Sequence, residues 1–250
     1  MDGNGVVRST LTIGRRFNGP KDSGNGGYVA GRLAALIGGP LSNRAAEITL
    51  RAPPPLDKPL DLVKSGEAIE LRDGDTLLAV VRPAALELEV PPVPAQVQLD
   101  RAATMGGSGA DSDFHKCFVC GRSREAGDGL RVWAGRCDGS GDMGLAAARW
   151  TPDARLADED GYLPDEYLWG ALDCPGATAV LREDDERMCL TGRMTGWVER
   201  RLKAGEAATV LAWPIAADGR KLTSGTAVID SQGRVCARAQ ILWIVLKEPL

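Results

Sequence analysis

The chain has 250 residues, 44% of them hydrophobic, so it can form one large domain or two modest ones with buried cores. Its formal net charge of -4 argues against the basic character of a nucleic-acid-binding protein. No apolar run approaches the roughly 20 residues that a membrane-spanning helix needs. The opening residues lack the basic and apolar regions of a secretion signal, and the six cysteines are scattered as in reduced proteins. We therefore expect a cytoplasmic protein without a membrane or nucleic-acid partner.

The first half predicts a strand, then a helix, then an antiparallel meander. Alternating residues at 8–13 are typical of a strand. Residues 26–37 follow a helical pattern that ends at the glycines and proline of 38–40. The strands expected after this helix span 46–52, 60–64, 67–72 and 76–89. Such a meander can bury the helix only if the sheet wraps around it.

The second half repeats this order of elements. Residues 166–181 are expected to form its helix. The expected strands are 130–133 and 144–150 before the helix, and 189–199, 206–215, 220–230 and 234–245 after it. A glycine-rich segment at 106–111 has the composition of a flexible link between the halves. We therefore predict two diverged copies of one unit, residues 1–112 and 113–250.

An ordered series of motifs gives the chain a family resemblance. Cys117-Phe118-Val119-Cys120-Gly121 is followed by Gly129-Leu130, and Ala171-Leu172-Asp173 lies in the second helix. In this series the chain resembles the hotdog family, and within it the double-hotdog acyl-CoA thioesterases of the phenylacetyl-CoA type. The resemblance implies an α+β fold with two long helices, each wrapped by a curved antiparallel sheet, and the two sheets side by side. It also implies a small acyl-CoA-like ligand, no cofactor, and a possible homodimer.

The resemblance further implies which residues carry the chemistry. In such thioesterases, glycine N–H groups at the start of a helix polarise the thioester carbonyl, and an aspartate from the partner unit acts as base or nucleophile. The first half carries Asn25-Gly26-Gly27 at the donor position, but Ala34 where the aspartate belongs. The second half carries Pro164-Asp165 at the donor position and keeps Asp173. The expected site is therefore a composite of Asn25, Gly26, Gly27 and Asp173, with Asn25 replacing the family's histidine.

Simpler interpretations of these residues remain open. The two glycines could belong to a loop, with Asn25 only capping the helix. Asp173 shares a helical face with Glu166 and could be solvated. Alternatively, Pro175 could lie near the first turn of a shorter helix, with Asp173 or Cys174 near its cap.

Candidate substrate contacts are aromatic and basic. Tyr28 and Trp169 lie on the two predicted helices and could line an acyl pocket, with core packing as the alternative. Four basic residues could bind the phosphates of coenzyme A, with plain solvation of turn charges as the alternative. They are Arg200, Arg201, Arg220 and Lys221.

The Cys117-x-x-Cys120 pair next to His115 suggests a zinc site. Structural zinc normally takes four ligands, and the sequence offers no second pair. Cys137 or Asp113 could complete a site, but their spacing does not indicate it. We therefore favour a plain turn or lid and expect no metal. The function predicted from the sequence is hydrolysis of an acyl-CoA-type thioester. The alternative is a double-hotdog protein that only binds acyl-CoA or serves as a scaffold.

Overall fold

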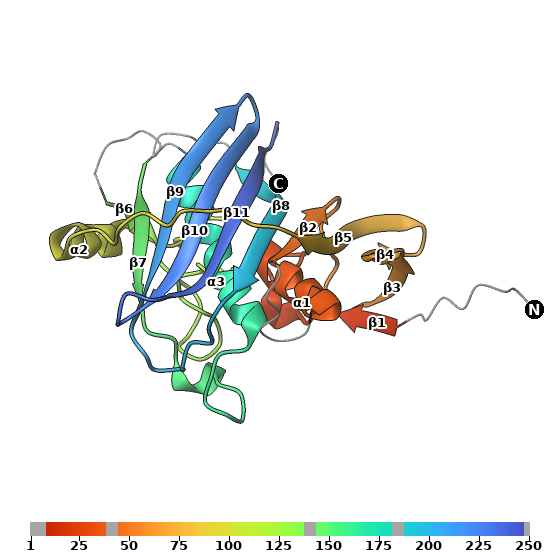
Figure 1. Cartoon of the computed structure of the whole chain (residues 1–250), viewed down its shortest axis with the longest axis horizontal. Coiled ribbons are helices and arrows are strands. Elements are labelled where there is room, and N and C mark those ends of the chain that lie inside the picture. The colour runs from red at the N-terminus through yellow and green to blue at the C-terminus, as the bar shows by residue number, and fades with distance from the viewer. Residues whose placement is uncertain (1–8, 39–44, 138–143, 182–187, 248–250) are drawn as a thin grey trace, which may run out of the picture.

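The computed structural model describes residues 9–38, 45–137, 144–181 and 188–247. Over these ranges the chain forms one 11-stranded sheet, antiparallel at every strand pair, and three α-helices (Figure 1). The α+β class predicted from the sequence is confirmed. The helices are α1 (Gly26–Gly38), α2 (Gln96–Met105) and α3 (Asp165–Val180). The strands are β1 (Ser9–Thr12), β2 (Ala45–Leu50), β3 (Pro59–Ser65), β4 (Ala68–Asp73), β5 (Thr76–Ala84), β6 (Gly135–Arg136), β7 (Ala146–Trp150), β8 (Cys189–Val198), β9 (Ala208–Asp218), β10 (Lys221–Asp230) and β11 (Val235–Val245).

The two halves of the chain share this sheet. Its strand order is β1-β3-β4-β5-β2-β8-β11-β10-β9-β7-β6, so the halves meet where β2 pairs with β8. That joint runs from the Ala46–Gly196 pair to the Thr49–Arg193 pair. The sequence predicts two sheets side by side, whereas the described strands form one continuous sheet. Its division into two hotdog units remains a proposal.

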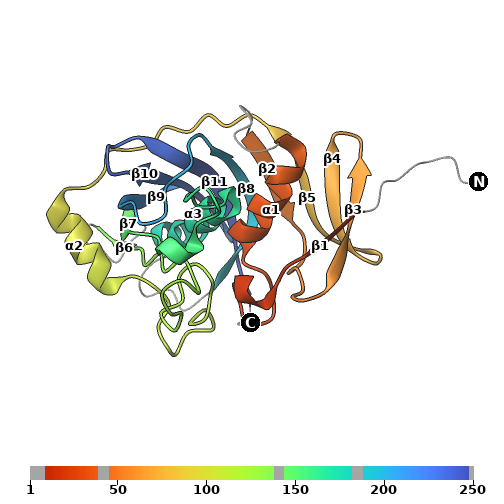
Figure 2. The same ribbon diagram turned by 90° about the horizontal axis from the view of Figure 1, so that it is seen from below.

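Helices α1 and α3 lie next to each other against the sheet, which curves around them (Figure 2). Their contact depends on glycines that admit close backbone approach. A Cβ atom on Gly27 would lie 2.5 Å from the Trp169 carbonyl oxygen, and one on Gly31 would lie 2.5 Å from the Cα of Glu166. These distances are far below van der Waals contact, so the crossing requires glycine at both positions.

Four aromatic rings pack beside this crossing and join three parts of the chain. The rings of Phe17 and Tyr28 stack with centroids 4.0 Å apart, and Phe118 and Tyr167 meet them edge-on or tilted. Offset or edge-to-face aromatic pairs each contribute about 0.5–1.5 kcal/mol beyond the area that they bury. The cluster therefore fixes the 117–120 segment against both helices.

Two elements differ from the sequence prediction. The strand expected at 130–133 is wrong, because Arg131 has φ 57°, a left-handed conformation that interrupts an extended strand. Helix α2 was not expected, because only Leu99 and Ala102 of its residues are buried and its apolar stripe is narrow. It packs on β6 and β7.

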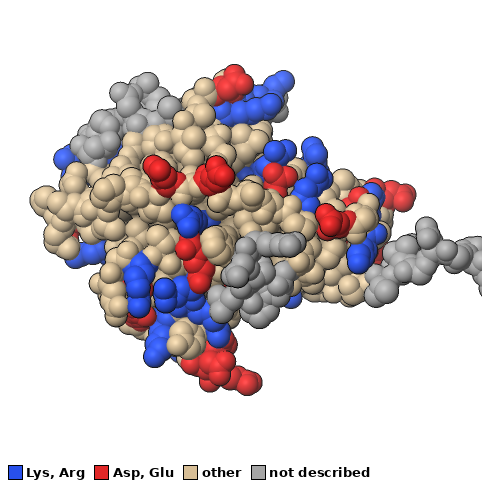
Figure 3. Space-filling model, viewed as in Figure 1, with Lys and Arg blue, Asp and Glu red and all other residues tan. Residues whose placement is uncertain are grey.

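The visible surface carries charges of both signs. On the face shown in Figure 3, acidic and basic side chains occur together in several groups that are separated by uncharged surface. Among the described residues, no helix combines the length and apolar character needed to cross a bilayer.

Candidate functional site

The start of α1 leaves one backbone donor available. The first N–H groups of a helix have no intrahelical acceptor and must find other partners. Here the Asn25 N–H donates to the Phe17 carbonyl (2.8 Å), and the Tyr28 N–H donates to the Asn25 Oδ1 atom (2.9 Å). The Gly27 N–H donates to the Asp173 Oδ2 atom (3.0 Å). Of the N–H groups at the start of α1, all of them in described residues, that of Gly26 is left without an acceptor.

Asn25 therefore both caps the helix and reaches the acidic residue. Its Oδ1 atom accepts the capping bond, while its Nδ2 group donates to Asp173 Oδ2 at 3.0 Å. The capping interpretation and the composite-site interpretation are thus compatible. The structure brings Asn25, Gly26, Gly27 and Asp173 together, although 148 positions separate Asn25 from Asp173.

Asp173 is buried, with 3% of its surface exposed, so the solvated alternative is wrong. Three donors hold its carboxylate: Asn25, the Gly27 N–H, and the Thr191 hydroxyl, which donates to Oδ1 at 2.7 Å. Burial raises the pKa of Asp173 to about 6, although these hydrogen bonds favour the charged form. The result is a carboxylate that can exchange a proton near neutral pH.

Thr191 was not predicted as a site residue. It lies in β8, which pairs with β2 at the joint between the two halves. A threonine in an alternating strand gives no signal of its own. Only the pairing of β8 brings its hydroxyl to Asp173.

Helix α3 continues through Pro175, so the shorter-helix alternative is wrong. Proline has no N–H group, and the Ala171 carbonyl therefore receives no bond from position 175. Pro175 lines the same cavity as Asp173.

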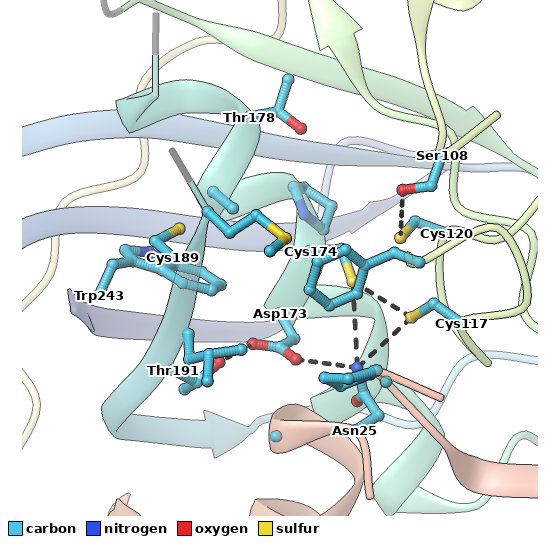
Figure 4. A pocket seen from close by; sticks show the side chains of 18 of the residues that line it. Asn25, Ser108, Cys117, Cys120, Asp173, Cys174, Thr178, Cys189, Thr191 and Trp243 are labelled. Carbon is cyan, nitrogen blue, oxygen red and sulfur yellow. Dashed lines mark hydrogen bonds between the residues drawn. The ribbon is translucent and has the colours of Figure 1, made fainter. Parts of the chain in front are cut away.

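Asp173, Asn25 and Gly26 line a cavity of about 600 Å³ (Figure 4). The volume lies within the usual range for small-molecule sites. One wall comes from large apolar side chains of β2, β8, β11 and the residues flanking β8 and β11. They are Leu50, Met188, Leu190, Trp243, Ile244 and Leu246.

The predicted aromatic contacts lie elsewhere. Tyr28 and Trp169 are 2% and 3% exposed and belong to the hydrophobic core, not to the cavity lining. Tyr28 stacks on Phe17, and the Trp169 ring occupies the space over Gly196. Both residues therefore belong to the core, which is the alternative considered from the sequence.

The four predicted basic residues also lie outside the cavity lining. Arg201 pairs with Asp158 and lies over the Tyr162 ring, and Arg220 donates to the Val245 carbonyl (3.2 Å). Arg200 and Lys221 are exposed. The basic residue that does line the cavity with an exposed side chain is Arg51, which follows β2 and was not predicted.

A cluster of three cysteines forms another part of the wall. The sulfur atoms of Cys117, Cys120 and Cys174 all lie within 4.8 Å of one another, and Cys117 and Cys174 are 3.7 Å apart. Thiol hydrogen bonds, chiefly from Cys120, hold the pKa of Cys117 well below its usual range. Neither Cys137 nor Asp113, the partners considered from the sequence, belongs to this cluster.

The glycine-rich segment expected to be a flexible link is ordered against this wall. The Ser108 N–H donates to the Cys120 carbonyl (3.0 Å), and the Ser108 hydroxyl contacts the Cys120 sulfur (3.4 Å). Gly107 and Ser108 both line the cavity.

No protein-family model and no curated protein matches the sequence. Solved structures do match over nearly the whole chain. A conserved protein of unknown function with a hot dog fold from Alicyclobacillus acidocaldarius has 13% identity and a TM-score of 0.60, with 100% of this chain and 96% of that chain covered. The acyl-CoA thioesterase II TesB2 from Mycobacterium marinum has 13% identity and a TM-score of 0.60, with coverages of 96% and 93%.

A third match is the pyran synthase domain from module nine of the sorangicin pathway, with 14% identity, a TM-score of 0.61, and coverages of 99% and 96%. Proteins with different activities therefore share this architecture, so the likeness alone does not assign a reaction. It does establish the fold: the chain is a hotdog-fold protein.

Proposed function

We propose that the protein hydrolyses an acyl-CoA-type thioester at one composite site between two hotdog units. The observation that carries the proposal is the hydrogen-bonded group of Asn25, Gly27 and Asp173 at the wall of the cavity. A helix start and a buried carboxylate supply the two functions that acyl transfer requires, a donor for the carbonyl oxygen and a base for water. The thioesterase named among the structural neighbours is consistent with this chemistry.

In the proposed reaction, the unpaired Gly26 N–H donates to the thioester carbonyl oxygen. This revises the expected pair of glycine donors, because the Gly27 N–H already bonds Asp173. Negative charge develops on the oxygen as water attacks, and a helix N-terminus stabilises such charge. Loss of one donor of this kind typically costs about 3–4 kcal/mol of transition-state stabilisation.

Asp173 activates the water. Its Oδ1 atom accepts one bond, from Thr191, and keeps a lone pair for a water O–H. The carboxylate takes the water proton as the C–O bond forms, and the tetrahedral intermediate then breaks its C–S bond. The same proton passes to the departing thiolate, which leaves a free acid, a thiol and the original carboxylate.

The apolar wall formed by Leu50, Leu190 and Trp243 suits the acyl chain. Removing each methylene of the chain from water contributes about 0.8 kcal/mol. The wall thus favours hydrophobic acyl groups over short polar ones.

Arg51 is the candidate contact for the phosphates of coenzyme A. We expect Arg51→Gln to raise KM for acyl-CoA about 1.4–5-fold with little change in kcat, because an exposed ion pair contributes about 0.2–1 kcal/mol. The effect should shrink as salt is added. Steady-state kinetics at two ionic strengths measure it, with Lys64→Gln, an exposed charge on β3, as the control. An unchanged KM would remove Arg51 from the phosphate site.

The test of the function itself is free-thiol release from a panel of acyl-CoAs, run beside calorimetric binding of a non-hydrolysable acyl-CoA analogue. Thiol release with at least one acyl-CoA supports the enzyme. The second candidate function is an acyl-CoA-binding module, which is favoured by the three bonds that Asp173 already makes. Binding without thiol release would support that candidate and contradict hydrolysis. Neither binding nor release would contradict both.

A further inference from the structure

We propose that Cys117, Cys120 and Cys174 form a binding site for a thiophilic divalent cation, with Zn²⁺ as the best match. The inference goes beyond the proposed hydrolysis and does not depend on it. The sequence alone favours a plain turn, because it offers one Cys-x-x-Cys pair and no second pair, and the spacing of the other candidate ligands does not indicate a site. The fold supplies the third sulfur from the middle of α3, 57 positions beyond Cys117.

The spacing of the sulfur atoms fits metal ligation. A tetrahedral zinc centre with Zn–S bonds of about 2.3 Å places its sulfur atoms about 3.8 Å apart. Cys117 and Cys174 are 3.7 Å apart, and no pair in the cluster exceeds 4.8 Å. Closing the remaining pairs onto an ion requires shifts of about 1 Å or less, which thiol rotations can provide.

Donors around the sulfurs suit thiolates. The Val119 N–H donates to the Cys117 sulfur (3.4 Å), and Ser108 contacts the Cys120 sulfur (3.4 Å). The Asn25 Nδ2 group lies 3.8 Å from the Cys117 sulfur and 3.9 Å from that of Cys174. Such outer contacts orient metal ligands and stabilise their charge. Figure 4 shows Asn25 and Ser108 approaching the cluster from two separate segments.

An ion can reach the cluster, and a fourth ligand can complete it. All three cysteines line the cavity, and Cys174 is only half-buried. The cavity side is therefore available to water, as in zinc sites with three protein ligands and one open position. Binding converts three thiols to thiolates and releases three protons, so affinity should rise with pH.

The ion would fasten the cavity wall. Cys117 and Cys120 belong to the segment between α2 and β6, whereas Cys174 belongs to α3 next to Asp173. A metal bridge would fix this segment on the helix that carries the proposed base. We expect chelation to lower the melting temperature, whether or not the protein turns over thioesters.

The test measures metal directly. Full-length protein purified under reducing conditions from zinc-supplemented cells should contain about one zinc per chain by mass spectrometry. Cobalt added to the metal-free protein should give a thiolate-to-cobalt charge-transfer band. Cys120→Ser and Cys174→Ser should each weaken zinc affinity at least about tenfold, since even outer-shell changes cost 10–100-fold. Cys236→Ser, a buried cysteine outside the cluster, is the matched control and should keep both signals.

Two results would overturn the proposal. One is the absence of both stoichiometric zinc and the cobalt band in folded, fully reduced wild-type protein. The other is a peptide map of protein purified without reductant that shows two of Cys117, Cys120 and Cys174 joined to each other as a disulfide. Metal content also separates this inference from the proposed function. A protein that contains stoichiometric zinc but releases no thiol would support the zinc site and contradict thioester hydrolysis.

Discussion

Replacing Asp173 by Asn is expected to lower kcat for thioester hydrolysis by at least about 100-fold, the usual contribution of a positioned general base. The amide cannot accept a proton from water, yet it can keep the local geometry. Its oxygen can face the Gly27 N–H and Asn25, and its NH2 group can face Thr191, whose hydroxyl accepts as well as donates. The loss should therefore appear in kcat without unfolding.

The measurement is initial-rate kinetics by thiol release, together with a thermal melt of each protein. Asp218→Asn removes an exposed carboxylate at the end of β9 and serves as the matched control, with an unchanged rate. If the Asp173→Asn protein has a normal melt and retains most of the wild-type kcat, another group must activate water. The proposed mechanism would then be wrong.

Gly27→Ala is expected to destabilise the protein strongly, although it adds only one methyl group. The added Cβ would lie 2.5 Å from the Trp169 carbonyl oxygen and 2.6 Å from the Cβ of Asp173. Backbone cannot rotate away as a flexible side chain can, so α1 and α3 must separate. Overpacking of this kind costs about 1–3 kcal/mol and sometimes more. For a chain of this size, that corresponds to a melting temperature about 2–12 °C lower.

Separating the helices should also lengthen the bond from the Gly27 N–H to Asp173, so activity should fall with stability. Gly109→Ala is the control, because its added Cβ would meet nothing within 4 Å. Calorimetry of the two variants measures the difference between their melting temperatures. Equal melting temperatures for the two variants would show that the helix crossing tolerates a methyl group, contrary to the close contact described here.

The elements with strong local signals were predictable from the sequence. Helix α1 was expected at 26–37 and spans Gly26–Gly38, because small residues and a terminal glycine pair mark it clearly. The meander was also predictable, since its tight turns use glycines with positive φ, Gly66 and Gly74. The pairing of the Asn25 region with Asp173 followed from the family resemblance, because no local pattern connects residues 148 positions apart.

The features that were missed depend on tertiary contacts. Thr191 reaches Asp173 only because β8 joins β2, and Cys174 meets Cys117 only because a loop folds over α3. Conversely, Tyr28 and Trp169 are candidates for the cavity because they lie on the two predicted helices, but close helix packing turns both into the core. Sequence periodicity identifies the apolar face of a helix, but it does not identify the element that packs against that face.

The joint between β2 and β8 has a consequence for synthesis in the cell. Its partners lie at 46–49 and 193–196, so β2 has to wait for most of the chain before this edge can be hydrogen-bonded. An uncovered strand edge readily recruits other chains and promotes aggregation. A nascent chain that stalls before residue 193 would therefore expose the unpaired edge of β2. Chaperones that shield this edge should increase the yield of folded protein.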